Sequence, residues 1–312
     1  MSVSELFEKF KNKDRVALSK IITLVENELN TEIIISEIYR FIGKAHRIGI
    51  TGPPGAGKST LLNKLSIYFK NNGFNPSIIA VDPSSPFSGG ALLGDRFRMM
   101  EASNEGIYIR SMASRGSLGG IAKSTIFVAD VMDAFGFDPI FIETVGVGQI
   151  ELDIMKASDT IVVVLVPESG DSIQAMKAGL MEIGDIFVIH KSDREGADKL
   201  YMDLKSTLEM GFNTKDKHWK PPIIKVSSLK NFGIDQLYNA ILNHKQHIKL
   251  SEKLLEMRKK RYILEFEELA KETLWKEFKK KINLDEILED GFLNKKSPYQ
   301  LIKEVLNDKN YS

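Results

Sequence analysis

The 312-residue sequence contains no cysteine, which excludes disulfides, cysteine-ligated zinc, iron–sulfur clusters and thiol catalysis. It also has no excess of either charge, because 43 Lys and Arg residues face 42 Asp and Glu residues and leave a net charge of +1. That balance gives no overall field for binding nucleic acid or an anionic membrane. The longest apolar runs, such as Thr160–Pro167, have the length of a strand and fall far short of a membrane span. The start of the chain lacks the apolar core of a signal peptide, so we expect a soluble, cytoplasmic protein that binds neither nucleic acid nor a membrane.

The pattern of apolar residues divides the chain into three predicted parts. Residues 1–44 form a helical extension, because apolar side chains recur there every three or four positions, and Asp14 and Thr31 are predicted helix caps. Residues 45–248 alternate short apolar runs with helical stretches, as expected of an α/β fold with a mainly parallel sheet flanked by helices. Residues 249–312 are again helical, either as a cap on the core or as a subunit interface. The runs predicted as strands are 48–51, 77–81, 107–109, 140–143, 161–166, 186–190 and 223–226.

The most specific motif is a glycine-rich loop between a predicted strand and a predicted helix. It fits G-x-x-x-x-G-K-[ST], the pattern of a P-loop. Its glycines let successive backbone N–H groups point at one anion, and the dipole of the following helix adds to their field. We expect Lys58 to reach the β- and γ-phosphates of a nucleoside triphosphate and Ser59 to offer its hydroxyl to Mg²⁺. The nucleotide-binding residues predicted here are Gly52, Pro53, Pro54, Gly55, Ala56, Gly57, Lys58, Ser59 and Thr60.

A P-loop needs a carboxylate in addition to the Ser59 hydroxyl on its metal side, at the end of a neighbouring strand. The apolar run Ile140–Glu143 ends in such a residue, and a glycine follows at position 146. Glu143 is therefore the predicted acidic partner of Lys58 and Ser59.

Two later loops carry residues suited to reading guanine. The segment 190–193 follows a predicted strand and resembles the N-K-x-D motif of GTP-binding proteins, with His190 where Asn is usual. The Asp193 carboxylate can accept two N–H bonds from guanine, which adenine cannot donate together, while the stem of Lys191 covers the base. Residues 227–229 resemble the loop that supports guanine O6 through backbone N–H groups. These features favour GTP over ATP, and we expect His190 to lower affinity because its donor and acceptor differ in geometry from those of Asn. The predicted residues of the second loop are Ser227, Ser228 and Leu229.

Further segments match one family in the right order along the chain. They are VDPSS at 81–85, GGALLGDR at 89–96, RSMASRG at 110–116, ETVGVGQ at 143–149 and PESGDSIQAMKAGLMEIGD at 167–185. With the P-loop, they resemble the methylmalonyl-CoA mutase-associated GTPases, which are chaperones of adenosylcobalamin-dependent mutases within the metallochaperone branch of P-loop GTPases. The sequence departs from the family pattern at His190, at Ser172, where a second Asp is common, and in the pair 168–169.

The resemblance implies Mg²⁺ and GTP or GDP as ligands. The metal-side residues that it implies are Ser59, Asp82, Asp95 and Glu143. Direct ligation by every carboxylate would overfill an octahedral site, so at least one is expected to act through water. Asp82 also suits a turn before Pro83, and Asp95 also suits a helix N-cap.

Few residues outside these motifs suit catalysis. Arg115 is the preferred arginine for stabilising charge in phosphoryl transfer, because glycines surround it, although Arg96, Arg98 and Arg110 are also candidates. Gln149 is a candidate for positioning water, although it is not adjacent to the glycine at 146. The predicted catalytic set is thus Lys58, Glu143, Arg115 and Gln149. No strong general base is visible, so we expect slow hydrolysis without a partner.

The leading hypothesis is a GTP-driven switch that gates cofactor loading or protection in an adenosylcobalamin-dependent acyl-CoA mutase of the methylmalonyl-CoA mutase type. The family resemblance also implies a homodimer formed through the C-terminal helices. One alternative is a kinase of the arginine/ornithine transport type, a name that family members often carry, but no acceptor-binding motif is visible. Another is a metal-insertion GTPase, but no His- or Cys-rich segment is present, and His244 and His247 are expected on a solvated helical face.

Overall fold

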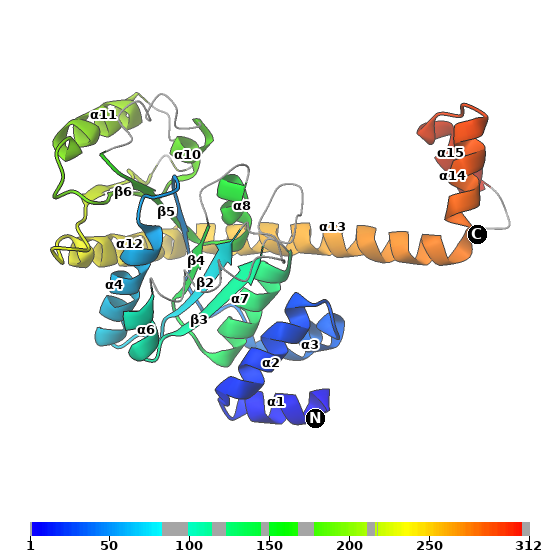
Figure 1. Ribbon diagram of the computed structural model, residues 1–312, viewed down its shortest axis with the longest axis horizontal. Coiled ribbons are helices and arrows are strands. Elements are labelled where there is room, and N and C mark those ends of the chain that lie inside the picture. The colour runs from blue at the N-terminus through cyan, green and yellow to red at the C-terminus, as the bar shows by residue number, and fades with distance from the viewer. Residues whose placement is uncertain are drawn as a thin grey trace. The chain divides into compact units, whose positions relative to one another are not determined.

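The computed structural model describes residues 2–82, 99–113, 123–144, 150–167, 178–210, 216 and 218–307 (Figure 1). The chain divides into two compact units, Met1–Leu254 and Leu255–Ser312. The domain boundaries predicted after residues 44 and 248 stay predictions.

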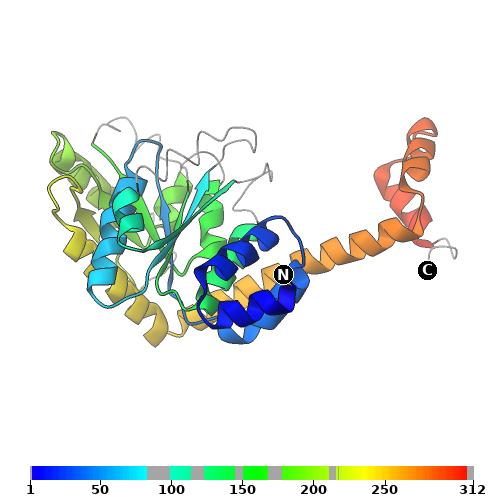
Figure 2. The ribbon, with the colours of Figure 1, turned by 60° about the horizontal axis from the view of Figure 1, so that its bottom comes forward.

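A parallel sheet lies at the centre of the first unit and has seven strands within the described ranges (Figures 1 and 2). Its strand order is β3-β2-β4-β1-β5-β6-β7, so β1 lies between β4 and β5. The chain turns from one half of the sheet to the other beside β1, and ligands of such sheets bind at the carboxyl ends of the strands at this point. The strands are β1 (Arg47–Thr51), β2 (Ser77–Asp82), β3 (Tyr108–Ala113), β4 (Ile140–Glu143), β5 (Thr160–Leu165), β6 (Ile186–Ile189) and β7 (Ile223–Lys225).

Helices cover both faces of this sheet, which explains why its strands are apolar without alternation. In β6, for example, Ile186 and Val188 pack into a core with α4 and α12, whereas Phe187 and Ile189 pack on the other face with α8, α10 and α11. The predicted α/β fold with a parallel sheet is therefore confirmed. The helices of this layered core are α4 (Lys58–Asn71), α6 (Met100–Asn104), α7 (Lys123–Phe135), α8 (Ile150–Ala157), α10 (Ala178–Ile183), α11 (Ala197–Glu209) and α12 (Ile234–Leu250).

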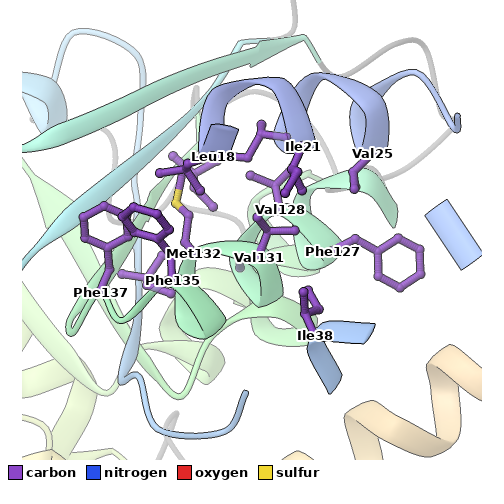
Figure 3. Packing of buried hydrophobic residues seen from close by; sticks show 14 of the residues in the cluster. Leu18, Ile21, Val25, Ile38, Phe127, Val128, Val131, Met132, Phe135 and Phe137 are labelled. Carbon is purple, nitrogen blue, oxygen red and sulfur yellow. The ribbon is translucent and has the colours of Figure 1, made fainter. Parts of the chain in front are cut away.

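The N-terminal helices add a further layer outside α7. Figure 3 shows apolar side chains of α2 meeting those of α7, namely Leu18, Ile21 and Val25 against Val128 and Met132. All of these side chains are buried, so the N-terminal helices share one continuous core with the sheet. The elements of this layer are α1 (Val3–Lys11), α2 (Arg15–Glu26), α3 (Thr31–Ile38) and the short 3₁₀ helix η1 (Tyr39–Phe41).

One of the two predicted helix caps is correct. Asp14 begins α2, and its carboxylate accepts hydrogen bonds from the backbone N–H groups of Val16 and Ala17 at 2.7 and 3.0 Å. The prediction for Thr31 is wrong, because Thr31 is already the first residue of α3 and Asn30 precedes it as the N-cap. Asn30 has φ 55°, a left-handed conformation that Asn tolerates better than Thr.

The second unit is helical, and α13 runs into it from the end of the first. Gly291 allows a close approach of its last two helices, because a Cβ at this position would lie 2.7 Å from Leu301 Cδ2. None of the described helices combines the length and the apolar character that crossing a membrane requires. The helices are α13 (Lys253–Lys281), α14 (Leu284–Leu293) and α15 (Pro298–Asn307).

Candidate functional site

The P-loop connects the carboxyl end of β1 to the first turn of α4, at the centre of the sheet. Two of its glycines are required by space as well as by conformation. Gly52 has φ +136°, and a Cβ there would lie 2.1 Å from the carbonyl oxygen of Val164. Gly57 has φ +83°, and a Cβ there would lie 2.7 Å from two ring atoms of His190. The loop therefore follows a path that packs its backbone against β5 and against the loop after β6.

Lys58 is the first residue of α4, yet its side chain turns back over the loop. Its Nζ donates hydrogen bonds to the carbonyl oxygens of Gly52 and Pro53 at 2.7 and 3.0 Å. Only 6% of the residue is exposed. These contacts hold the ammonium group beside the loop backbone, where an anion bound in the loop would meet it.

Oxygen ligands suited to a hard cation meet beside the loop. The Ser59 hydroxyl donates a hydrogen bond of 2.7 Å to Glu143 Oε1, as β1 and β4 are paired with Ile50 opposite Glu143. Strand β2 pairs with β4 on its other side and ends at Asp82, two positions beyond the residue opposite Glu143. A hydroxyl and a carboxylate in contact fit Mg²⁺, which prefers oxygen ligands and usually takes only one or two carboxylates along with phosphate oxygens. The larger clusters of three or more His or acidic residues that could hold a metal by themselves are absent from the described residues.

The loop after β6 is attached to the P-loop through His190. Its Nδ1 lies 2.7 Å from the carbonyl oxygen of Ala56, and its Nε2 lies 2.8 Å from Ser228 Oγ. The residue is 4% exposed. Burial lowers the pKa of the His190 imidazole below its ordinary value, which favours the neutral ring near pH 7.

Asp193 stands at the exposed end of the same loop, with its carboxylate oriented by a neighbour. The Ser227 hydroxyl donates a hydrogen bond to Asp193 Oδ1. This bond is the main cause of the lowered pKa of the Asp193 carboxyl, which is therefore ionised at neutral pH. The Ser192 backbone N–H also donates to the carbonyl oxygen of Val226 at 3.1 Å, so the loops after β6 and β7 support each other. Leu229 is 87% exposed at the tip of the second loop.

The structure thus brings the predicted P-loop residues, Glu143 and both base-side loops to the carboxyl edge of one sheet. Asp95, Arg115 and Gln149 lie outside the described residues, as do Arg96 and Arg98, and the same holds for the side chain of Asp82. The Arg110 guanidinium forms an ion pair with Glu26 of α2 and so is bound to the N-terminal layer.

Two features of the described residues were not predicted. The Thr144 hydroxyl donates to Thr51 Oγ1 at 3.2 Å and joins the ends of β4 and β1 next to the P-loop. His244 is 2% exposed and not solvated as predicted, because its Nδ1 lies 2.7 Å from Thr160 Oγ1 and Trp219 packs against its ring. Helical spacing places His244 and His247 on one face of a helix, but it does not indicate that β5, through Thr160, packs against His244.

Comparison with known proteins decides the family. A family model described as "Methylmalonyl Co-A mutase-associated GTPase MeaB" matches residues 18–283, most of the chain. The chain belongs to the MeaB family. A Pyrococcus horikoshii protein described as a GTPase is 52% identical to it over 262 residues, which cover 83% of each chain.

Two further relatives agree with this assignment. The mouse protein named methylmalonic aciduria type A homolog, mitochondrial, is 32% identical over 296 residues, which cover 89% of this chain and 71% of that protein. The crystal structure of a LAO/AO transport system kinase matches with a TM-score of 0.74 at 25% identity and covers 98% of this chain and 97% of that one. This MeaB-family chain is therefore a P-loop GTPase that binds GTP and GDP and hydrolyses GTP.

Proposed function

We propose that this MeaB-family GTPase is a chaperone of an adenosylcobalamin-dependent acyl-CoA mutase of the methylmalonyl-CoA mutase type. In this function, GTP binding and hydrolysis gate the loading or protection of the mutase cofactor. The observation that carries the proposal is the family match over residues 18–283, because this range includes every nucleotide-binding element described above. The mouse relative, whose name refers to methylmalonic aciduria, supports the same class of partner.

The proposed roles follow from the geometry at the carboxyl edge of the sheet. Lys58 binds the β- and γ-phosphates, since its Nζ already lies against the loop carbonyls. Ser59 and Glu143 hold Mg²⁺, with Asp82 and Asp95 contributing directly or through water. Bound Mg²⁺ would neutralise the charge that develops on the phosphate oxygens during transfer. Catalysis then depends on positioning and charge, and Arg115 and Gln149 remain the proposed additional groups.

On the base side, Asp193 is the proposed reader of guanine. Its ionised carboxylate can accept the N1–H and N2–H groups together, and adenine offers no such pair of donors. Lys191, which has φ 53°, begins the turn that brings Asp193 to the edge of the site. Backbone N–H groups of residues 227–229 are proposed to support guanine O6.

A homodimer formed through the second unit is also part of the proposal. Helix α13 exposes large apolar side chains, including Tyr262 at 54%, Phe266 at 64% and Trp275 at 48%, and exposure of this kind typically marks an interaction surface. Sedimentation of the full chain and of a chain shortened after Leu254 measures this directly. We expect two chains per particle for the full chain and one for the shortened chain. The same number of chains per particle in both would exclude the second unit as the dimer interface.

The proposed location is the cytoplasm.

The function is tested in two steps. Fluorescent GDP and ADP are first titrated with and without Mg²⁺, using the wild type and Asp193→Asn. We expect strong preference for GDP in the wild type and loss of that preference in the variant. Equal or tighter ADP binding would reject Asp193 as the guanine reader.

The second step measures association with a purified adenosylcobalamin-dependent mutase in the presence of GTP, GDP or no nucleotide. Nucleotide-dependent binding, together with GTP turnover, is the expected result, and Lys58→Ala serves as the control that lacks the phosphate contact. Absence of any association with the mutase would reject the chaperone function. Transfer of labelled phosphate from GTP to arginine or to a protein would instead favour a kinase.

A further inference from the structure

His190 has no polar atom left for a ligand. The carbonyl oxygen of Ala56 can only accept a hydrogen bond, so the Nδ1 that lies 2.7 Å from it carries the ring proton. The neutral ring then has an unprotonated Nε2, which accepts the Ser228 hydroxyl proton over 2.8 Å. Imidazole has two nitrogen atoms, and the protein uses both.

The ring also cannot turn to release one of them. A Cβ placed on Gly57 would lie 2.7 Å from both Cε1 and Nδ1 of His190, which shows how tightly the ring packs on the P-loop backbone. The residue is almost fully buried between this loop and Ser228. Rotation of the ring would therefore break two hydrogen bonds and displace the phosphate-binding loop.

An asparagine in this place would behave differently. Its amide carries two N–H donors and a carbonyl oxygen, so it can support a neighbouring loop and still offer an N–H group to the base. Guanine presents N7 and O6 as acceptors on one edge, and a free N–H donor could recognise N7. His190 has no such donor left.

We infer that His190 is a positioning residue that joins the P-loop to the loop after β7, and that this GTPase reads guanine without a hydrogen bond from His190 to N7. Selectivity for guanine then rests on the Asp193 carboxylate and on the backbone of residues 227–229. The inference depends on the guanine site of the proposed function and adds that binding is insensitive to the atom at position 7 of the base, whereas a site with a free Asn N–H at this position could recognise N7.

Nucleotide analogues separate these contacts. In 7-deaza-GDP a C–H group replaces N7, whereas IDP keeps N7 but lacks the 2-amino group that Asp193 would bind. For the wild type we expect GDP and 7-deaza-GDP to bind with equal affinity within about twofold, and IDP to bind at least about fivefold more weakly, the loss expected for one hydrogen bond. ADP serves as the reference for binding through the phosphates alone.

Two variants complete the experiment. His190→Asn is expected to gain a preference for GDP over 7-deaza-GDP of about fivefold or more, because the amide supplies the missing donor. Ser228→Ala keeps the imidazole on the P-loop and removes one of its partners, so it should weaken GDP and 7-deaza-GDP equally and leave their ratio near one. Thermal unfolding of each variant without nucleotide reports on its folding.

The outcomes are distinct. A wild type that binds GDP at least about fivefold more tightly than 7-deaza-GDP overturns the inference, because N7 is then recognised. The wild-type ratio decides this even if His190→Asn does not fold. A wild type that binds ADP as well as GDP would instead contradict the guanine site on which the inference rests.

Discussion

Removal of the Asp130 carboxylate is expected to destabilise the protein strongly, because it leaves a buried guanidinium without its closest partner. Arg47, the first residue of β1, is 4% exposed, and its Nη2 lies 2.5 Å from Asp130 Oδ1 on α7. Burial by itself would lower the pKa of this guanidinium, but Asp130, Asp159 and Asp133 outweigh it and raise the pKa. Arg47 therefore stays charged in the folded protein.

Neither remaining carboxylate is expected to replace Asp130, since Asp159 already accepts a hydrogen bond from the Arg47 backbone N–H at 3.1 Å. Asp133 lies 3.9 Å from Arg47 Nη2. Its two oxygens already accept hydrogen bonds from the backbone N–H groups of Gly43, Lys44 and Ala45, at 2.7 to 3.2 Å. A shift of Asp133 toward Arg47 would break bonds that hold the chain entering β1. We therefore expect Asp130→Leu to cost about 3–5 kcal/mol, the range for a buried ion pair that loses one partner.

Urea unfolding of the wild type, Asp130→Leu and the double variant Arg47→Met with Asp130→Leu measures this cost. The double variant should recover part of the lost stability, because it removes the buried guanidinium that has lost its partner, while Asp133 and Asp159 stay buried. GDP affinity of the folded proteins should stay within about twofold, since Arg47 and the P-loop lie at opposite ends of β1, about 13 Å apart along the strand. A single variant that loses less than about 1 kcal/mol, or a double variant as unstable as the single one, would refute the reasoning.

Three further predictions address the site, the N-terminal layer and acid stability. Lys58→Ala should reduce GTP turnover at least about 100-fold without lowering the unfolding midpoint by more than a few degrees, measured by phosphate release and calorimetry. Leu18→Ala should cost about 2–5 kcal/mol in urea unfolding, because Leu18 is fully buried between α2 and α7. Burial raises the pKa of Asp216, but hydrogen bonds from Lys253 and His247 outweigh it, so the folded-state pKa lies below the ordinary value. The Asp216 contribution to stability is thus present above the unfolded pKa of about 4 and lost progressively as the pH falls toward the lower folded-state pKa. The free energy of unfolding of Asp216→Asn, measured by urea unfolding at several pH values below about 4, should therefore depend less on pH than that of the wild type.

The parts of the fold that were predicted correctly depend on local sequence. Strand β4 was predicted with its observed bounds because Ile140–Glu143 is buried on both faces, and such a strand reads as an unbroken apolar run. The P-loop was found because its glycines and Lys58 act on one ligand from consecutive positions. These signals need no knowledge of distant segments.

The errors concern contacts between distant segments. Strand β3 covers Tyr108–Ala113, whereas the prediction covered 107–109. The prediction ended there because Arg110 interrupts the apolar pattern. In the fold, Arg110 is compatible with the strand since Glu26 of α2 neutralises it. His244 was predicted to be solvated because nothing in its own helix reveals Thr160, which lies 84 positions earlier.

The base-side loops also show what a motif can and cannot predict. Residues 227–229 were predicted to act through backbone N–H groups, yet their serine side chains have separate roles. The Ser227 hydroxyl orients the Asp193 carboxylate, and the Ser228 hydroxyl donates a hydrogen bond to His190 Nε2. One loop thus positions both the residue that is proposed to read guanine and the residue that supports the P-loop. Because these two contacts come from adjacent serines, a shift of the loop after β7 would affect base recognition and phosphate binding together, although the two subsites lie on different strands.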